Sequence, residues 1–220
     1  LFRSCGLPPL VLYRRFGNPQ VFAELDRTYV AGAFRLDPYY DLHRQRAPDG
    51  VYRLRDIAPD AFHRSRYFIE YYDQTTLTDE ITFVVWPAPG VSLNLCLGRD
   101  ASSGRGFGAA DLEVCQRLGP VVTALARAHW RGIAESAGPA EDTAAVLARS
   151  AERLHGIALS PRQAEVALLI LRGHSTVSIS LRLGLSPQTV KVFRKQLYQR
   201  CAISSQAELF ALMLPLLKAG

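Results

Sequence analysis

The sequence predicts an α+β amino-terminal domain on a mainly antiparallel sheet, followed by an all-α domain of four helices. Strand-like and helical segments are mixed in the first part of the 220-residue chain without repeated βαβ units, and only helical periodicity follows Gly156. Between the two parts, Gly138-Pro139 breaks a helical pattern, and a short Ala-rich helix then ends at Gly156. We therefore expect a first domain over residues 1–137, a connector over 138–158 and a helical domain over 159–220.

Four segments of the first domain have the length and composition of strands. They are rich in β-branched or apolar residues and are bounded by Pro, Gly or Asp: PLVLYRR, VYRLRDI, DEITFVVWP and VSLNLCLG. Only residues 88–90 separate the last two, which predicts a tight hairpin. Helical spacing is found over residues 19–34, 37–45 and 65–73, and in a longer helix after Gly108. Hairpins with flanking helices are typical of an α+β domain.

Each helix of the carboxyl-terminal domain has its own start signal. Ser160-Pro161 with Gln163 forms a capping box with proline at the first helical position, and this helix ends at Gly173. The other three helices have the N-cap candidates Ser175, Ser186 before Pro187, and Ser205 with Glu208. Four helices with short links, the middle two joined by Gly-Leu-Ser, have the plan of a helix-turn-helix.

The net charge of +6 is concentrated at the carboxyl end of the chain. Residues 156–220 contain 8 Lys and Arg but only 2 Asp and Glu, whereas residues 1–155 contain 18 of each kind. This asymmetry favours two modules, of which the basic one binds a polyanion. A basic helical bundle that binds a protein is the alternative that charge and helices alone leave open.

The third helix of this domain, which begins after Ser186, divides into two faces. Val190, Leu197 and Cys201 follow the 3.6-residue period and are expected to pack inward. The opposite side has no carboxylate to relieve the repulsion among its cations, and its residues are Lys191, Arg194, Lys195 and Tyr198. A uniformly positive helix face suits the major groove of DNA, where Lys donates to guanine O6 and N7.

Further DNA contacts are expected along the same helix. The side chain of Val192 can contact a thymine methyl group. The amino end of the helix has free backbone N–H groups that suit phosphate contacts, and its polar residues are Ser186, Gln188 and Thr189. The helix therefore combines expected base contacts with expected backbone contacts.

The carboxyl-terminal sequence resembles the DNA-binding domain of LuxR-type transcriptional regulators. The family pattern is a Leu-Thr/Ser-Pro-Arg start, a Glu-Val pair, a Gly after the first helix, and Leu-Gly-Leu-Ser-Pro-x-Thr-Val-Lys. The matching residues are Leu159 to Arg162, Glu165-Val166, Gly173 and Leu183 to Lys191. The resemblance implies a bacterial transcription factor whose third helix enters the major groove of double-stranded DNA. It implies base contacts by Lys191, Val192 and Lys195, and backbone contacts by Gln188, Thr189, Arg194 and Arg200.

The sequence departs from the family pattern in three places. Thr176 to Ser180 replaces an Asn-Lys-Glu-Ile-Ala segment, Phe193 replaces a common histidine, and Ala202 stands where glycine is usual. A left-handed backbone at Ala202 would cost about 1 kcal/mol. These departures permit an alternative function, namely a protein-binding adaptor or a ligand-independent regulator with weakened DNA readout.

The first domain resembles the sensory domains that precede such helix-turn-helix domains. Tyr29, Gly32, Phe34 and Asp37-Pro38-Tyr39-Tyr40 resemble the region around an Asp-Pro of autoinducer-binding domains. Those domains, like GAF and PAS modules, are α-β-α sandwiches with a ligand pocket on one face of the sheet. The resemblance implies a small-molecule effector, with the candidate ligand-binding residues Tyr29, Phe34, Asp37, Tyr40, Tyr52 and Trp86. Ordinary core packing is the alternative account of these aromatic residues.

The resemblance also implies a homodimer on an operator with two half-sites. Two helices carry apolar residues that could form the interface, one over residues 111–131 and the other over residues 206–217. The apolar residues of the second helix are Leu209, Leu212, Met213, Leu216 and Leu217. Packing inside the chain's own core accounts equally well for both helices.

No catalytic or metal site is expected. The five histidines show no HExxH spacing, no GxSxG turn occurs, and the four cysteines form no CxxC pair, which favours buried free thiols. GRGFGA, residues 104–109, fits the GxGxxG/A form, but no second parallel strand or ribose-binding acid follows it, which favours a flexible surface loop. We expect no enzyme activity, no cofactor and no membrane span, and hence a cytoplasmic protein.

Overall fold

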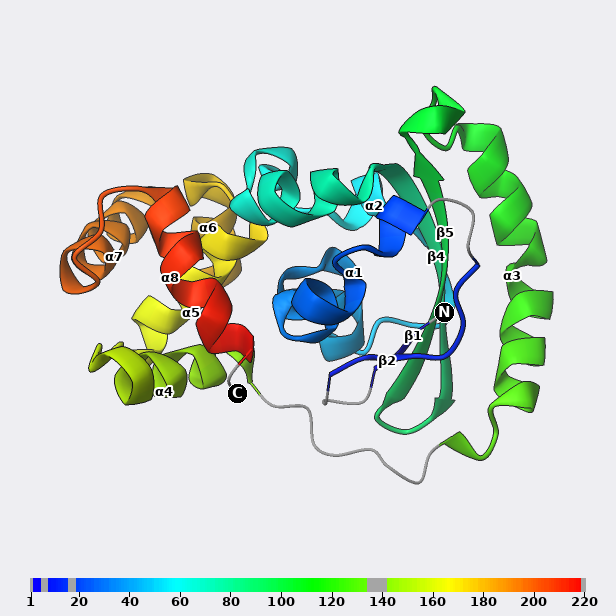
Figure 1. Cartoon of the computed structure of the whole chain (residues 1–220), viewed down its shortest axis with the longest axis horizontal. Helices are drawn as coiled ribbons and strands as arrows, with labels where there is room; N and C mark the ends of the chain where they lie inside the picture. Colours follow the sequence, from blue (N-terminus) through cyan, green and yellow to red (C-terminus); the bar gives the residue numbers. More distant parts are fainter. Residues whose placement is uncertain (1, 5–7, 16–18, 134–141, 219–220) are drawn as a thin grey trace. The chain divides into compact units, whose positions relative to one another are not determined.

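The computed structural model describes residues 2–4, 8–15, 19–133 and 142–218 (Figure 1). The chain forms two compact units. The sheet unit comprises residues 1–30, 38–58 and 73–140, and the helical unit comprises residues 31–37, 59–72 and 141–220. The helix break predicted at Gly138-Pro139 lies outside the described residues, as does Cys5. Within the described parts of the chain, no helix has both the length and the apolar character needed to span a membrane.

The sheet unit is built on five antiparallel strands in the order β2-β1-β5-β4-β3. Ala88 pairs with Val91 in the predicted tight hairpin, and Gly90 adopts a φ of 76° in the two-residue turn between them. The mainly antiparallel sheet expected from the sequence is therefore confirmed. The strands are Phe2–Ser4 (β1), Leu10–Val11 (β2), Gly50–Arg53 (β3), Leu77–Ala88 (β4) and Val91–Asp100 (β5).

Two strands are shorter than predicted. In PLVLYRR only Leu10 and Val11 pair with β1, and in VYRLRDI the strand gives way after Arg53 to a single helical turn, α2 (Leu54–Ile57). This turn buries Leu54 and brings Arg55 to a carboxylate of β4. The turn ends at Ala58, which is extended, because a residue that precedes a proline is disfavoured in a helix.

Helices cover both faces of the sheet (Figure 1). α1 (Pro38–Arg44) lies on one side and α3 (Ala109–His129) lies on the other. The α-β-α arrangement and the long helix after Gly108 are thus as expected. On the α3 side the core consists of Val85, Leu93 and Ala126, packed against Leu12, Leu95, Trp130 and Ile133.

The other helical segments are less regular than predicted. Residues 19–34 form separate 3-10 and π-helical turns, as do residues 62–75. In the second segment the ring of Phe62 contacts four other rings at centroid distances of 5.4 to 6.1 Å: His63, Tyr67, Phe68 and Tyr72. Packing among these large rings shapes the segment more strongly than helical propensity does.

The helical unit contains the predicted helices, and their caps are as expected. The side chains of Ser160, Ser175 and Ser186 each accept the backbone N–H of the residue three positions later. Ala202 has a φ of 54°, so the left-handed conformation persists there without glycine, at a cost of about 1 kcal/mol. The helices are α4 (Thr143–His155), α5 (Pro161–Arg172), α6 (Thr176–Leu183), α7 (Pro187–Arg200) and α8 (Gln206–Lys218).

The apolar side of α8 is buried within the helical unit. α8 packs against α4 and α5, and α4 contributes the buried residues Val146, Leu147 and Ala151. Core packing therefore accounts for this helix, one of the two proposed as a dimer interface. The buried residues of α8 are Leu209, Phe210, Met213, Leu216 and Leu217.

Candidate DNA-binding surface and sensor site

α7 is fixed in the helical unit by its cap and by its inner face. The hydroxyl of Ser186 accepts the backbone N–H of Thr189 at 3.0 Å, which sets the first turn. Val190, Leu197 and Cys201 are buried, as predicted, and α7 packs against α5 and α6. The rotation of the helix about its axis is therefore determined by apolar packing.

The outer face of α7 is exposed and cationic. Lys191 and Lys195 are both exposed, and Val192 between them is 45% exposed. Within the described parts of the chain, neither lysine forms an ion pair with a carboxylate. The predicted residues of the first turn are also accessible, since Ser186 and Gln188 are exposed and Thr189 is half-buried. The helix thus presents a connected positive surface next to uncharged hydrogen-bonding groups.

Unlike the two lysines, the two arginines of α7 that were predicted to contact DNA form contacts within the chain. Arg194 is half-buried and lies over the ring of Tyr198, 5.2 Å from its centroid. The guanidinium of Arg200 donates to the carbonyl of Ala158 at 2.7 Å and to Oε1 of Gln163 at 3.0 Å. Arg200 therefore links the end of α7 to the start of α5.

A groove of about 350 Å³ lies beside α7 in the helical unit. Arg194 lines this groove together with the amino end of α6 at Ser175 and Thr176, and Arg64 lines it as well. Arg64 is marked by no local sequence pattern, because its approach to α6 depends on contacts between residues more than 100 positions apart. The remaining lining residues are Ala61, Ile170, Gly173, His174, Ile179, Val190 and Gln206.

The arrangement of α5 to α8 and the cationic face of α7 define a DNA-binding protein of the helix-turn-helix class. Residues 158–213 match the family described as bacterial regulatory proteins, luxR family, so this part of the chain is similar to the helix-turn-helix domain of that family.

Parts of this chain are similar to known proteins. A protein of Aeromonas salmonicida named "Putative HTH-type transcriptional regulator in exeN 3'region" is 29% identical over 185 residues, which are 81% of this chain and 93% of that protein. The response regulator GacA of Pseudomonas aeruginosa is 41% identical over 51 residues, 23% of this chain and 24% of that protein. The crystal structure of the VqsR LBD domain from Pseudomonas aeruginosa aligns with 59% of this chain and 75% of that chain, with 26% identity and a TM-score of 0.48.

The six predicted ligand-binding residues fall in both units. Phe34 and Asp37 belong to the helical unit, where Phe34 is buried and the hydroxyl of Tyr67 lies 3.5 Å from Oδ2 of Asp37. The other four belong to the sheet unit: Tyr29, Tyr40, Tyr52 and Trp86.

Two of these sheet-unit residues flank a buried histidine. The ring of His43 stacks between Tyr40, at 5.8 Å, and Trp86, at 5.3 Å. The indole N–H of Trp86 donates to the carbonyl of Ala47, and the hydroxyl of Tyr52 donates to the carbonyl of Pro48. These contacts make the aromatic residues part of the packed layer formed by α1 and the sheet.

One face of the sheet carries buried polar side chains that were not predicted from the sequence. Thr82, Ser92 and Asn94 point to the same side of β4 and β5 and are all buried. Ser92 Oγ is 2.7 Å from Nδ1 of His43. Among the described residues, Oδ1 of Asn94 has no hydrogen-bond partner although it is buried. This polar face could have been predicted from the sequence, because polar residues occupy alternate positions of otherwise apolar strands.

Acid is expected to destabilise the sheet unit through His43. Burial, assisted by the charges of Arg44 and Arg46, lowers the pKa of His43 from 6.5 to about 4. Because the folded pKa is below the unfolded one, the unfolded chain binds more protons between these values. The stabilisation is complete above pH 6.5 and is lost as the pH falls through about 4, a change of roughly 3 kcal/mol.

Urea denaturation of the chain across this pH range measures the effect. The His43→Gln variant is expected to lose less unfolding free energy on acidification than the unmodified chain. An equal loss in both proteins would show that His43 does not cause the pH dependence.

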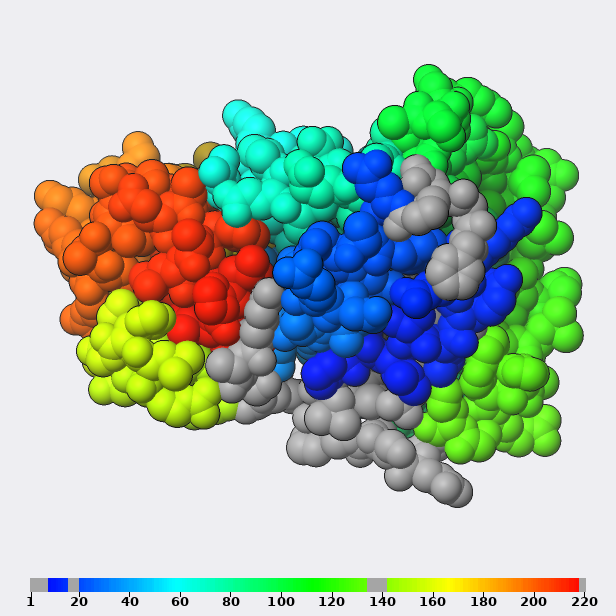
Figure 2. All heavy atoms as spheres, viewed as in Figure 1, coloured from blue at the N-terminus to red at the C-terminus, as the bar shows by residue number. Residues whose placement is uncertain are grey.

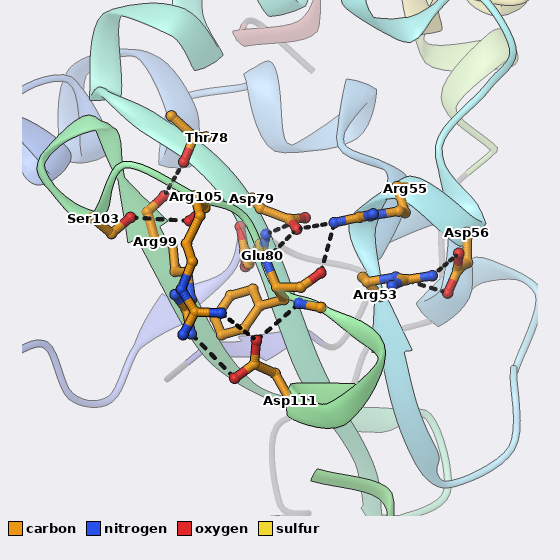
Figure 3. Close-up of polar contacts among 12 residues, drawn as sticks. Arg53, Arg55, Asp56, Thr78, Asp79, Glu80, Arg99, Ser103, Arg105 and Asp111 are labelled. Atoms are coloured by element: carbon orange, nitrogen blue, oxygen red, sulfur yellow. Dashed lines mark hydrogen bonds and ion pairs between the residues drawn. The ribbon is translucent and has the colours of Figure 1, made fainter. Parts of the chain in front are cut away.

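The GRGFGA segment is tied to the sheet unit by two carboxylates (Figure 3). Asp79 on β4 accepts the backbone N–H of Phe107 and the guanidinium of Arg55, both at 2.8 Å. Asp111 accepts the backbone N–H of Gly108 at 2.8 Å and pairs with Arg99, and these contacts lower the pKa of its carboxyl group. The backbone N–H groups of Phe107 and Gly108 are thus bound by carboxylates of the chain itself.

The cysteines are free where the structure describes them. Cys201 is buried as expected, whereas Cys96 and Cys115 are half-buried. Within the described ranges, no group of three or more His, Cys, Asp or Glu is placed to hold a metal ion.

Proposed function

We propose that the chain is a cytoplasmic homodimer that regulates transcription by inserting α7 into the major groove of an operator with two half-sites. The observation that carries this proposal is the exposed face of α7, on which Lys191 and Lys195 have no compensating acid. Such a face repels itself in the free protein by a few tenths of a kcal/mol per pair, and it gains when it meets phosphates and base edges.

The DNA contact proposed for each residue of α7 follows from how exposed its side chain is. Lys191, Val192 and Lys195 would contact base edges, since they lie on the most accessible side of the helix. Gln188 and Thr189 in the first turn would contact phosphates, with Ser186 holding the turn. Arg194, which is half-buried beside Tyr198, would reach the backbone from the edge of the surface. Arg200, which already binds Ala158 and Gln163, would act mainly by positioning α7 on α5.

Selection of tight binders from a pool of random duplexes tests this function. The selected duplexes are expected to share an inverted repeat whose half-site centres are about 34–36 Å apart, which is roughly one turn of B-DNA. Enrichment of no common sequence, with binding that does not depend on salt, would instead support the protein-binding adaptor.

We further propose that α3 pairs with α3 of a second copy. Four apolar residues recur along α3 at intervals of four, three and four positions, which places them on one stripe of the helix. Their exposed fractions are 53% for Val114, 51% for Leu118, 58% for Val121 and 66% for Leu125. α3 lies at the surface of the sheet unit (green in Figure 2). Monomeric proteins rarely leave such a contiguous apolar stripe in water. In the described part of α8, by contrast, no large apolar side chain is exposed.

A sensory role for the sheet unit is a second proposal, supported by Asn94. A buried carbonyl oxygen without a donor is costly, and a bound molecule that supplies an N–H or O–H group would satisfy it. Native mass spectrometry of freshly purified protein tests this role. A ligand-free mass, with no change of melting temperature across a panel of metabolites, would support a ligand-independent regulator.

A further inference from the structure

The exposed face of α7 contains a line of four side chains that points directly away from the core. Val190 is buried, and Gln199 follows it by nine positions, which is about two and a half turns of an α-helix, so Gln199 lies on the opposite side of the helix. We call this row of side chains the outward line. Its members are all exposed or, like Val192, nearly half exposed, and they recur at intervals of four, three and four positions: Gln188, Val192, Lys195 and Gln199.

Gln199 is the member of the outward line that the proposed DNA contacts do not yet use. It is exposed, and among the described residues its side-chain amide has no hydrogen-bond partner. Arg200, the next residue, is different, because its guanidinium is already bound within the chain. The amide of Gln199 is therefore available to a partner outside the chain.

The last turn of α7, which carries Gln199, is anchored on α5. The guanidinium of Arg200 donates to the carbonyl of Ala158 at 2.7 Å and to Oε1 of Gln163 at 3.0 Å. The backbone N–H of Cys201 donates to the carbonyl of Leu197 at 2.9 Å, and both of these residues are buried. Helix ends commonly fray, whereas a side chain that reads a base needs a rigid support. These contacts give Gln199 such a support.

The amide of glutamine is complementary to one base in particular. It offers both an N–H donor and a carbonyl acceptor, whereas the ammonium group of lysine can only donate. In the major groove, adenine presents the N6 donor beside the N7 acceptor, and glutamine binds both atoms at once. Guanine presents two acceptors there, which suits lysine. The outward line therefore combines side chains that prefer different bases.

Gln199 is within reach of a base if Lys195 is. The two residues are four positions apart on one side of α7, which is about 6 Å along the helix axis. Successive base pairs of B-DNA are about 3.4 Å apart, so this distance corresponds to slightly less than two steps. A helix that follows the groove thus brings Gln199 to a base edge about two pairs from the one that Lys195 contacts.

We propose that Gln199 is a specificity-determining residue that binds N6 and N7 of an adenine in each half-site of the operator. The proposal rests on the DNA-binding function of α7 proposed above and adds a base that this function leaves unassigned. Each half-site then contains an adenine about two base pairs from the guanine that Lys195 reads.

Replacement of single adenines in a selected operator tests this contact. Each adenine is replaced in turn, in both half-sites, by 7-deazaadenine, which lacks the N7 acceptor but still pairs with thymine. The unmodified chain is expected to lose about tenfold in affinity at one position, equivalent to 1.4 kcal/mol. The Gln199→Ala variant is expected to bind the ordinary operator about tenfold more weakly and to be insensitive to 7-deazaadenine at that position.

Gln196→Ala is the matched control, because Gln196 is an exposed glutamine of the same helix that lies off the outward line. This variant is expected to keep the sensitivity of the unmodified chain to 7-deazaadenine. Fluorescence anisotropy at one fixed salt concentration measures all three proteins, and thermal melting confirms that they are folded.

A Gln199→Ala variant that stays sensitive at the same adenine would overturn the proposal, as would an unmodified chain that is insensitive at every adenine. Equal losses of affinity for operator and unrelated duplexes in Gln199→Ala would overturn it too, since Gln199 would then contact only the DNA backbone. If the unmodified chain binds no duplex at all, the proposed function fails instead, so the two failures are distinguishable.

Discussion

The Lys191→Ala variant is expected to bind its operator with sequence discrimination reduced by roughly 1–3 kcal/mol. The reason is the position of Lys191 on the exposed face of α7, where the buried residues Val190 and Leu197 fix the rotation of the helix. A lysine held in this way donates to a guanine edge in one register only. Its loss therefore weakens binding to the operator more than binding to unrelated DNA.

The measurement is a competition between operator and non-operator duplexes at constant salt. Arg153→Ala is a suitable control, because Arg153 is an exposed cation of α4, away from the face of α7. If both variants lose the same affinity for both duplexes, Lys191 supplies only nonspecific charge and the assignment of base readout to it is wrong.

Placing glutamates at Leu118 and Leu125 together is expected to make the chain a monomer. Both residues lie on the apolar stripe of α3 and are more than half exposed, so the substitutions leave the packing of the sheet unit intact. In a paired interface each glutamate would bury a charge without a partner, which is strongly unfavourable. The monomer would also lose the gain of binding two half-sites at once, a factor of about 100 or more.

Sedimentation analysis and DNA titration measure the two consequences. Affinity for a single half-site is expected to stay unchanged. Leu154→Glu serves as control, because Leu154 on α4 is also a half-exposed leucine. A double variant that still sediments as a dimer would show that α3 is not the interface.

The helical unit could be predicted closely because its signals are local. Ser160 with Gln163, Ser175 and Ser186 mark the helix starts within a few residues, and glycine marks the ends of α5 and α6. The inward face of α7 followed from the spacing of its apolar residues. The role of Arg200 as a link to Ala158 and Gln163 did not, since it depends on how two helices pack.

The irregular segments of the chain could not be predicted in the same way. Residues 62–75 have helical spacing, but contacts among the rings of Phe62, Phe68 and Tyr72 replace a regular helix by 3-10 and π turns. The contact of Asp60 with Ser175 joins residues separated by 115 positions, and no local pattern marks it. The sequence shows that the helix over residues 111–131 carries apolar residues, but only the structure distinguishes the exposed ones from the buried ones.

A titration of operator duplex with the full chain at increasing salt tests most directly whether the face of α7 binds DNA. The logarithm of the affinity is expected to fall linearly with the logarithm of the salt concentration. Lys195→Ala is expected to reduce this slope by about one. Affinity that does not change with salt, or no binding to any duplex, would contradict it.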